Sequence, residues 1–380
     1  MLGTRTSLKL KIAEGLCRGA EPYLGSLSEA SNVAVYSLGR RVFEKLITKH
    51  SVRENYFIPP SALSSNLWGI KFGSPICNSA GMFKKGDSYD LMARLGAGAY
   101  LGGTSTYNPR KGNTKANIHL PFVKLPKSKI SINYLGLPNL GDEILSKKVF
   151  TQKKIEGCPI GWSVMRSPDF SMEEAQEKLV RSLNLYQKNT QIDFIEINES
   201  CPNVKSSSHS ILARLDFIAE QFLKKRNRHL PVIVKLSNDI SENSLIEILH
   251  SMVKLGFDGI NLGNTSTDYE ALKEKIEDGD LKLFEFFTKQ FGGGVGGHVL
   301  KSKSLQLSKI AVDELKKINR RNEFHIIRTG GIESFDDIKE SMDIGVSMNQ
   351  WLTGFYDSFL KEGNNVYKNF FERESVAEKL

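Results

Sequence analysis

The chain is organised around the stretch Ile195-Glu196-Ile197-Asn198-Glu199-Ser200-Cys201-Pro202-Asn203-Val204. Its first half alternates apolar and polar residues, which is typical of a β-strand, and it runs into a thiol flanked by two carboxamides and a proline. Such residues build a poor apolar core, but they can offer hydrogen bonds and a base to a small planar ring. The stretch therefore predicts a strand that ends in a functional site.

Short apolar runs and amphipathic helical segments alternate from about residue 71 onward. We expect strands at 75–80, 99–102, 130–133, 160–164, 194–198, 232–236, 259–262, 325–328 and 347–351. Helical patterns lie between several of them, at 172–186, 211–225, 244–255, 304–318 and 335–342. Repeated strand-then-helix units indicate a parallel sheet, and about eight of them that close up predict a (β/α)8 barrel. A doubly wound open sheet is the structural alternative.

Length and composition agree with one large α/β domain. A chain of 380 residues can hold a single barrel with extensions, since such barrels have about 250 residues or more. The apolar fraction of 40% and the charged fraction of 25% indicate a soluble globular protein. No apolar run approaches the roughly 20 residues that span a bilayer, and the first residues show no secretory signal. The four cysteines are widely spaced, which favours a reducing, cytoplasmic location.

Two features bear on partners. The net charge is +9, yet basic and acidic residues are mixed along the chain, which favours a solvated surface with anion steering over nucleic-acid binding. Residues 1–65 are expected to form a helical extension before a barrel at 66–380, with paired prolines at 59–60 near the boundary. The helical pattern in this extension favours packing on the barrel over contact with a membrane, because no dense Trp/Lys/Arg signature accompanies it.

A barrel would bring the residues at the carboxyl ends of its strands to one mouth. Amides, hydroxyls, lysines and glycines dominate these positions, and no His/Asp/Glu cluster of metal-ligand type occurs among them. The sequence therefore predicts the site of an organic cofactor and no metal. The mouth positions are Ser79, Ala80, Gly81, Lys84, Gly103, Thr104, Asn133, Ser163, Asn198, Cys201, Asn203, Lys235, Asn264, Thr265, Gly330, Gly331 and Thr353.

Two glycine clusters favour a phosphate-bearing cofactor. Gly330 and Gly331 follow a strand and precede a helical pattern, where backbone N–H groups and a helix N-terminus can bind an anion, although a tight turn would need the same residues. The second cluster, at 291–297, has five glycines within the six positions 292–297. It can form a flexible hinge or a backbone that lies flat against a large ligand.

Lys235 and Cys201 are the two candidate reactive side chains. Lys235 lies near the end of an apolar strand, where three roles are open to it. Its stem can snorkel along the apolar surface, its amine can act as a Schiff-base nucleophile, or its fixed charge can lie beside an electron-rich ring. Cys201 is either an inert buried thiol or a general base. The polar neighbours Asn198, Ser200 and Asn203 favour the base, because a thiol has an unperturbed pKa near 8.5 that a site can lower.

With these residues in view, the chain resembles the dihydroorotate dehydrogenases, which are FMN-dependent (β/α)8 barrels. The similarity extends over about residues 71–359. Its most specific segments are Asn-Glu-Ser-Cys-Pro-Asn at 198–203, Ile-Asn-Tyr-Leu-Gly-Leu-Pro-Asn-Leu-Gly at 132–141 and Thr-Gly-Gly-Ile at 329–332. Segments at 79–81, 112–113, 264–265 and 350–354 support it.

The resemblance implies roles for individual residues. Cys201 would remove a ring proton while a hydride passes from the adjacent carbon to the flavin, and Lys84 would pair with the substrate carboxylate. The implied substrate contacts are Lys84, Asn133, Asn198, Asn203 and Asn264. The implied FMN contacts are Ala80, Gly81, Thr104, Ser163, Asn198, Lys235, Thr265, Gly297, Gly330, Gly331 and Thr353.

Features of two branches of the family occur together. Cys201 and the segment 136–141 are similar to the soluble branch, which reduces fumarate or, through a partner subunit, NAD. The long amino-terminal extension and the position of Lys84 are similar to the membrane-associated, quinone-reducing branch, which usually has a serine base. The expected electron acceptor is therefore a quinone or fumarate, and the alternative to a free cytoplasmic protein is peripheral contact with the inner membrane through the extension.

Three features depart from the family pattern. Glu199 replaces an apolar residue, and a carboxylate that faced the site would repel an anionic substrate. Arg328 stands where the family has glycine, beside the expected phosphate turn, which it would strengthen or crowd. Residues 205–209 lack the usual lid sequence of the family.

Together these observations predict an FMN oxidoreductase that converts (S)-dihydroorotate to orotate in pyrimidine biosynthesis. One alternative keeps the flavin but acts on another dihydropyrimidine or cyclic amide, because of Glu199 and the altered segment 205–209. A different class of enzyme would be a Schiff-base lyase or aldolase that uses Lys235. A binding or regulatory barrel without turnover is the remaining hypothesis.

Overall fold

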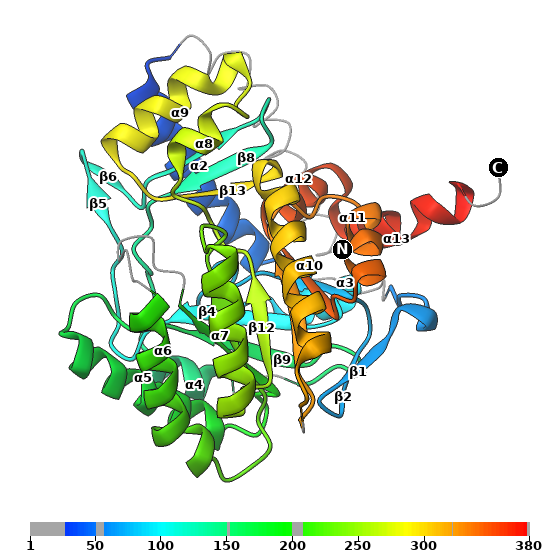
Figure 1. Cartoon of the computed structure of the whole chain (residues 1–380). Coiled ribbons are helices and arrows are strands. Elements are labelled where there is room, and N and C mark those ends of the chain that lie inside the picture. The colour runs from blue at the N-terminus through cyan, green and yellow to red at the C-terminus, as the bar shows by residue number, and fades with distance from the viewer. Residues whose placement is uncertain (1–26, 51–56, 150–152, 200–207, 321, 378–380) are drawn as a thin grey trace.

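A closed parallel barrel forms the centre of the computed structural model, which describes residues 27–50, 57–149, 153–199, 208–320 and 322–377 (Figure 1). Its eight strands lie in the order β3-β15-β14-β12-β11-β10-β9-β4. The two end strands meet, because the Gly81 N–H donates to the Gly103 carbonyl at 2.7 Å and Phe83 bridges Gly102. This confirms the predicted (β/α)8 fold. The strands are β3 (Ile76–Asn78), β4 (Tyr100–Ser105), β9 (Ile160–Val164), β10 (Phe194–Asn198), β11 (Val232–Leu236), β12 (Gly259–Leu262), β14 (His325–Thr329) and β15 (Met348–Trp351).

Helices surround the barrel, and several of them begin and end where local chemistry requires it. Ser171, Ser241 and Ser334 are N-caps whose hydroxyls accept a backbone N–H of the first turn. Gly256 and Gly345 end their helices in the left-handed conformation, with φ of 84° and 102°. The surrounding helices are α3 (Tyr89–Leu95), α4 (Asp142–Val149), α5 (Met172–Lys188), α6 (Ser208–Gln221), α7 (Glu242–Leu255), α10 (Lys301–Lys317), α11 (Phe335–Ile344), α12 (Thr353–Glu362) and α13 (Val366–Ala377).

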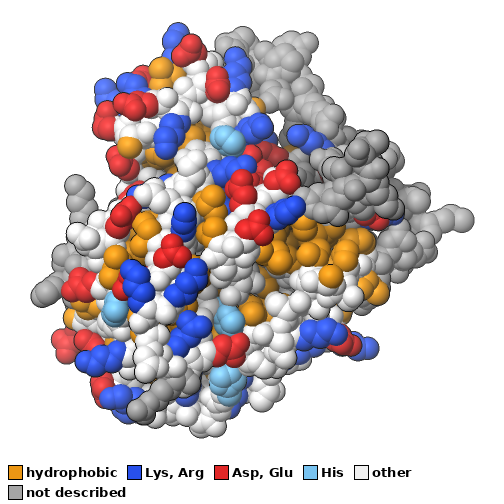
Figure 2. Space-filling view, turned by 45° about the vertical axis from the view of Figure 1, so that its right-hand side comes forward, with side chains coloured by type: hydrophobic (Ala, Val, Ile, Leu, Met, Phe, Trp, Pro, Cys, Tyr) orange, Lys and Arg blue, Asp and Glu red, His pale blue; other side chains and the backbone are white. Residues whose placement is uncertain are grey.

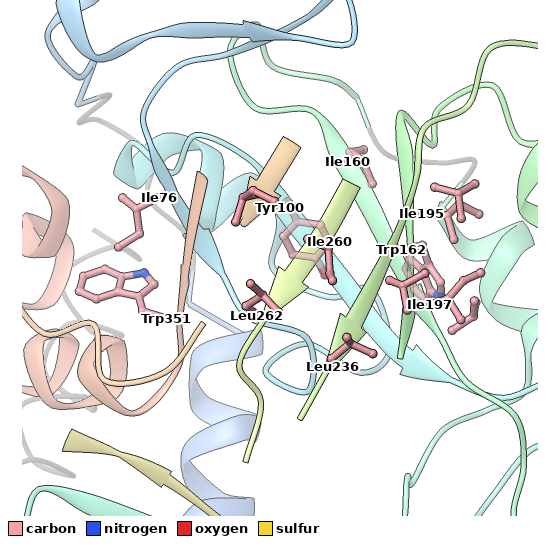
Figure 3. Close-up of a cluster of buried hydrophobic side chains, with 14 of the residues drawn as sticks. Ile76, Tyr100, Ile160, Trp162, Ile195, Ile197, Leu236, Ile260, Leu262 and Trp351 are labelled. Atoms are coloured by element: carbon pink, nitrogen blue, oxygen red, sulfur yellow. The ribbon is translucent and has the colours of Figure 1, made fainter. Parts of the chain in front are cut away.

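The outward faces of the barrel strands are mainly apolar. Ile195 and Ile197 of β10 lie beside Trp162 of β9 in the large core between strands and helices (Figure 3). The inward-facing side chains are apolar near the amino ends of the strands and polar near their carboxyl ends. Near the amino ends, Phe194 and other apolar side chains pack with Trp68 in a second cluster. Trp68 lies beside a hairpin of β1 (Ser65–Leu67) and β2 (Ile70–Phe72), and its indole N–H donates to the Asp258 carbonyl at 2.9 Å.

Polar residues occupy the upper inward positions, near the carboxyl ends of the strands. Because side chains alternate across a strand, the residues two positions after the lower apolar layer also face inward. They are buried and hydrogen-bonded to one another across the barrel. The mouth of the barrel therefore has a polar floor, which comprises Ser79, Ser163, Glu196, Lys235, Asn261, Thr329 and Gln350.

A separate cap with its own apolar core covers the carboxyl side of the barrel (Figure 1). Its antiparallel sheet joins β7 (Phe122–Leu125), β8 (Ile130–Asn133) and β13 (Gly294–Gly297) in the order β13-β8-β7. The prediction that 130–133 is a barrel strand was therefore wrong, because a short apolar run does not reveal which sheet it joins. The glycine cluster also differs from the expected loop, since Gly294–Gly297 pairs with β8.

The helices of the cap come from distant parts of the chain. Helices α8 (Tyr269–Lys273) and α9 (Asp278–Gln290) follow β12, and α2 (Glu29–Thr48) comes from the amino-terminal region. Helix α2 confirms the expected helical segment and buries Val33 in the cap core. Whether 1–65 is a separate unit stays a prediction. Within the described ranges, no helix is long and apolar enough to cross a membrane.

Acidic and basic side chains are interspersed over the face in Figure 2, as the mixed charge pattern of the sequence suggests.

Candidate active site

A chain of hydrogen bonds joins predicted site residues from four parts of the mouth. The hydroxyls of Ser163 and Thr104 lie 3.0 Å apart, and the Asn198 amide donates to Thr104 Oγ1 at 3.4 Å. The Asn264 amide in turn donates to Asn198 Oδ1 at 3.4 Å. The structure therefore brings together residues of β9, β4, β10 and the loop after β12, as expected of residues at the carboxyl ends of barrel strands.

Lys235 lies fully buried at the polar floor of the mouth. Its ammonium group donates to Ser79 Oγ at 3.1 Å and to Gln350 Oε1 at 3.0 Å. Burial lowers the pKa of Lys235, while the negative charge of Glu196 opposes that shift. The sequence reading missed Glu196 and Gln350 as members of the site, although both occupy inward positions that strand alternation could have identified.

Lys84, the expected partner of a substrate carboxylate, contacts the amino-terminal helix. Its ammonium group donates to the Gly81 carbonyl at 2.6 Å and lies 3.5 Å from Glu44 Oε1 of α2. Arg40 of the same helix also forms an ion pair with Glu44. Burial lowers the pKa of Lys84, and the carboxylate of Glu44 raises it. No motif in the sequence pointed to Glu44, because only the tertiary packing of α2 places it here.

Gly297, Gly330, Gly331 and Thr353 come together on another side of the mouth. A Cβ added to Gly297 would lie 3.3 Å from Thr353 Cγ2, and one added to Gly331 would lie 2.4 Å from the Cα of Lys301. Gly330 and Gly331 have φ of 118° and 74°. The turn after β14 can therefore be built only with glycine, and its backbone lies against the first turn of α10.

Helix N-termini border this glycine turn. A Cβ added to Gly354, in the first turn of α12, would lie 2.3 Å from the carbonyl oxygen of Ile332. Helix α11 begins immediately after the turn with a capping box between Ser334 and Asp337. Backbone N–H groups and two helix N-termini favour an anion such as a phosphate.

The remaining predicted residues lie near these groups or outside the described ranges. Thr265 lies under β13, since a Cβ on Gly294 would be 2.1 Å from Thr265 Oγ1. The amide of Asn133 donates to the Gly294 carbonyl at 3.4 Å. Ala80 precedes Gly81, whose φ of 93° and open space above its Cα leave room for a ligand. Cys201 and Asn203 lie outside the described residues.

Glu199 faces away from the barrel interior. It follows Asn198 on the strand, so its side chain takes the opposite, outward direction. Its carboxylate accepts from Arg214 Nε at 2.9 Å and lies 2.8 Å from Arg214 Nη2 and 3.4 Å from Arg166 Nη2. The concern that Glu199 would repel an anionic substrate from inside the mouth is therefore removed.

Arg328 also faces outward, between α10 and α11. Its guanidinium donates to Ser304 Oγ at 3.0 Å, Ser341 Oγ at 2.8 Å and the Asp337 carbonyl at 3.1 Å. It neither enters the mouth nor crowds the glycine turn. Ser304 also donates to the Gly330 carbonyl at 2.7 Å, so Arg328 supports that turn indirectly.

The fold and the site define a class: a (β/α)8-barrel protein whose polar mouth lies beside a glycine turn and helix N-termini that can bind an anion. A buried cation lies at the floor, hydroxyls and amides line the walls, and a glycine turn with helix N-termini offers an anion site. In the part of the chain that the structure describes, no group of three His, Cys, Asp or Glu residues could hold a metal.

The chain belongs to the dihydroorotate dehydrogenase family, because the sequence profile of that family matches residues 62–370. It is accordingly an oxidoreductase of this family. A "Dihydroorotate dehydrogenase (quinone)" of Photobacterium profundum is 27% identical over 296 residues, which cover 76% of this chain and 81% of that protein. The protein of the same name from an Arthrobacter species is 27% identical over 328 residues, which cover 82% of this chain and 84% of that protein.

Solved structures show the same fold. DHODH from Eimeria tenella in complex with ferulenol superposes with a TM-score of 0.71 at 19% identity, covering 88% of this chain and 89% of that one. The ligand-free form from the same organism gives a TM-score of 0.72 at 19% identity, with coverage of 88% and 92%.

Proposed function

We propose that this protein oxidises (S)-dihydroorotate to orotate with bound FMN as the hydride acceptor and a quinone as the final electron acceptor. The observation that carries the proposal is the arrangement of the mouth, in which buried Lys235 donates to Gln350 Oε1 and the same oxygen accepts from the hydroxyl of Thr329, the residue before the Gly330-Gly331 turn. Family membership supports the substrate. The names of the relatives support a quinone as the final electron acceptor.

The residues present fit FMN. The backbone of Gly297, Gly330 and Gly331, with Thr353 at the start of α12, would hold the phosphate. Lys235 would place a positive charge beside the ring. When bound, FMN supplies a reducible ring that accepts a hydride. The remaining proposed contacts to the ring system are Ala80, Gly81, Thr104, Ser163, Asn198 and Thr265.

Substrate binding would use both charge and amide matching. Lys84 would pair with the carboxylate of dihydroorotate, which takes the place that Glu44 partly occupies. Asn133, Asn198 and Asn264, with Asn203, would match the donors and acceptors of the ring. Cys201 would remove the ring proton, a role in which a general base contributes about 10²–10⁴-fold.

The proposal is tested by anaerobic reduction followed by reoxidation. The purified protein should be yellow, and dihydroorotate should bleach the absorbance near ~450 nm that is typical of oxidised flavin. Quinone, fumarate and NAD are then added separately, and quinone should restore the colour fastest. A colourless protein that does not take up FMN contradicts the function, and faster reoxidation by fumarate or NAD contradicts the acceptor.

Dihydrouracil serves as the comparison substrate, because it has the same ring without the carboxylate. We expect little bleaching with it, since Lys84 would have no partner. Equal bleaching by both compounds would favour the alternative of a broader dihydropyrimidine oxidoreductase. The outward direction of Glu199 removes one of the two reasons for that alternative.

A hydrophobic contact through α2 belongs to the same proposal. Val35, Leu38 and Val42 are exposed by 44%, 55% and 48% on the face of α2 that points away from the cap core. Such a stripe on a helix favours a lipid surface or an apolar ligand. The quinone-type relatives support this interpretation.

A further inference from the structure

Two opposite charges are enclosed in the floor of the barrel mouth. Glu196 of β10 is fully buried, and Lys235 of the neighbouring strand β11 is 1% exposed. Enclosed charges are costly unless they are compensated. Nevertheless, the ammonium group of Lys235 has only neutral hydrogen-bond acceptors within the described chain, Ser79 Oγ and Gln350 Oε1.

Gln350 connects the two charges. Its amide nitrogen donates to Glu196 Oε2 at 2.8 Å, and its amide oxygen accepts from Lys235 Nζ at 3.0 Å. The amide dipole therefore points its positive end at the carboxylate and its negative end at the ammonium group. Asn261 gives Glu196 Oε2 a second donor at 2.8 Å. Thr329 fixes Asn261, because its hydroxyl donates to Asn261 Oδ1 at 2.8 Å.

We propose that Glu196 is a positioning residue that acts through Gln350 to keep Lys235 a fixed cation at the floor of the mouth. The effect of this cation on the reaction rests on the proposed flavin function, because a fixed positive charge at this place would stabilise the reduced, anionic flavin. Glu196 itself is enclosed beneath the mouth and bonded to side-chain amides, so its effect on a ligand passes through Lys235.

The neighbours of Lys235 show why Glu196 is needed. Burial lowers the pKa of Lys235, and the groups that oppose this shift are Glu196 of β10 and Cys77 of β3. Burial also raises the pKa of Cys77 far above neutrality, so this thiol is uncharged and compensates no cation. Glu196 therefore provides the negative charge that favours protonated Lys235.

The first test measures the reduction potential of the bound flavin against pH in Glu196→Gln. Without the carboxylate, Lys235 should lose its proton at a lower pH. At about pH 9 the equilibrium for flavin reduction should then be at least about tenfold less favourable than in the wild type, which is about 30 mV for a two-electron couple. Toward lower pH, where protonation of Lys235 is again favoured, the deficit should shrink or disappear.

Glu199→Gln is the matched control, because Glu199 is a buried carboxylate on the same segment that faces outward. Its flavin potential should follow that of the wild type at every pH. Lys235→Met should have a low potential that does not recover at low pH. A wild-type potential in Glu196→Gln, or an equal shift in Glu199→Gln, would overturn the proposal.

The second test does not depend on flavin. The full chain, freed of any flavin, is unfolded in urea as wild type, Glu196→Gln, Lys235→Met and the double variant. The double variant should be less destabilised than the two single changes together predict, by at least about tenfold in the unfolding equilibrium, since it leaves no lone buried charge. Additive effects would overturn the pairing.

The two tests separate failure of the inference from failure of the proposed function. If the protein binds no flavin but Glu196 and Lys235 show the coupling in urea, the proposed flavin function is contradicted and the interaction between Glu196 and Lys235 is supported. If Glu196→Gln does not accumulate in folded form, recovery of folding in the double variant supports the pairing, and loss of folding in both variants counts against it.

Discussion

Glu196 and Glu199 are buried carboxylates on opposite faces of one segment, and their binding partners differ in kind. Glu196 faces into the barrel, accepts hydrogen bonds from two amides, and is connected to Lys235 through Gln350. Glu199 faces outward and binds Arg214 of α6 directly. Strand alternation separates the two residues, although they lie close together in the sequence. The comparison teaches that the outer charge holds a helix, whereas the inner charge supports a site.

Removal of Arg214 should have the largest effect on stability. Among the described residues, Arg214→Met leaves the buried Glu199 carboxylate with Arg166 at 3.4 Å as its one cation, so the free energy of unfolding should fall by about 3–5 kcal/mol in urea titrations. Lys224→Met is the matched control, because it removes an exposed ion pair with Glu220 at the end of the same helix and should change stability by less than about 1 kcal/mol. Equal losses would show that the outer pair has no special role.

Substitution of Cys201 tests the end of the same segment. Cys201→Ala should retain FMN and slow anaerobic flavin reduction by at least ~10²-fold, the lower range for loss of a general base. Stopped-flow absorbance near ~450 nm measures this rate. Cys77→Ala is the control, because Cys77 is a buried thiol below the mouth. Normal reduction in Cys201→Ala would remove Cys201 from the mechanism.

Glu44→Gln tests whether the amino-terminal helix acts on the site through charge. Loss of the carboxylate frees Lys84 for the substrate, so KM for dihydroorotate should fall by about two- to fivefold, the size expected of a partly exposed ion pair. Steady-state kinetics give this value. Asp90→Asn breaks the Arg94 pair on α3 and should leave KM unchanged. An unchanged KM in Glu44→Gln would mean that Glu44 does not compete for Lys84.

The exposed stripe of α2 should have the smallest effect on the folded protein. Leu38→Gln with Val42→Gln should reduce sedimentation with liposomes and change the free energy of unfolding by less than about 1 kcal/mol. Ile144→Gln is the control, because Ile144 is 57% exposed on α4 of the barrel. If both variants and the wild type sediment equally, α2 does not provide the membrane contact.

Much of the fold was readable from local patterns. The eight barrel strands and five of the surrounding helices, α5, α6, α7, α10 and α11, follow from apolar runs, alternation and serine or glycine caps such as Ser334 and Gly345. The segment Ile130–Asn133 was misassigned, because its apolar residues fit either the barrel or the cap. Its partner β13 lies far along the chain, and pairing over such a distance leaves no local signal.

The site was predictable in part. Thr104, Ser163, Asn198 and Asn264 could be grouped because strand ends in a barrel converge. Glu44 could not be found, since its position at Lys84 depends on the packing of α2.

The sequence by itself determined the class of fold, the family and the chemical types of the residues at the mouth, because each depends on local periodicity or on a short motif. Only the tertiary structure decided which way Glu199 and Arg328 point, that Glu196 and Gln350 connect to Lys235, and that α2 reaches Lys84. The physical reason is that the effect of a charge depends on its distance from other charges and on its burial, and both are set when distant segments pack together.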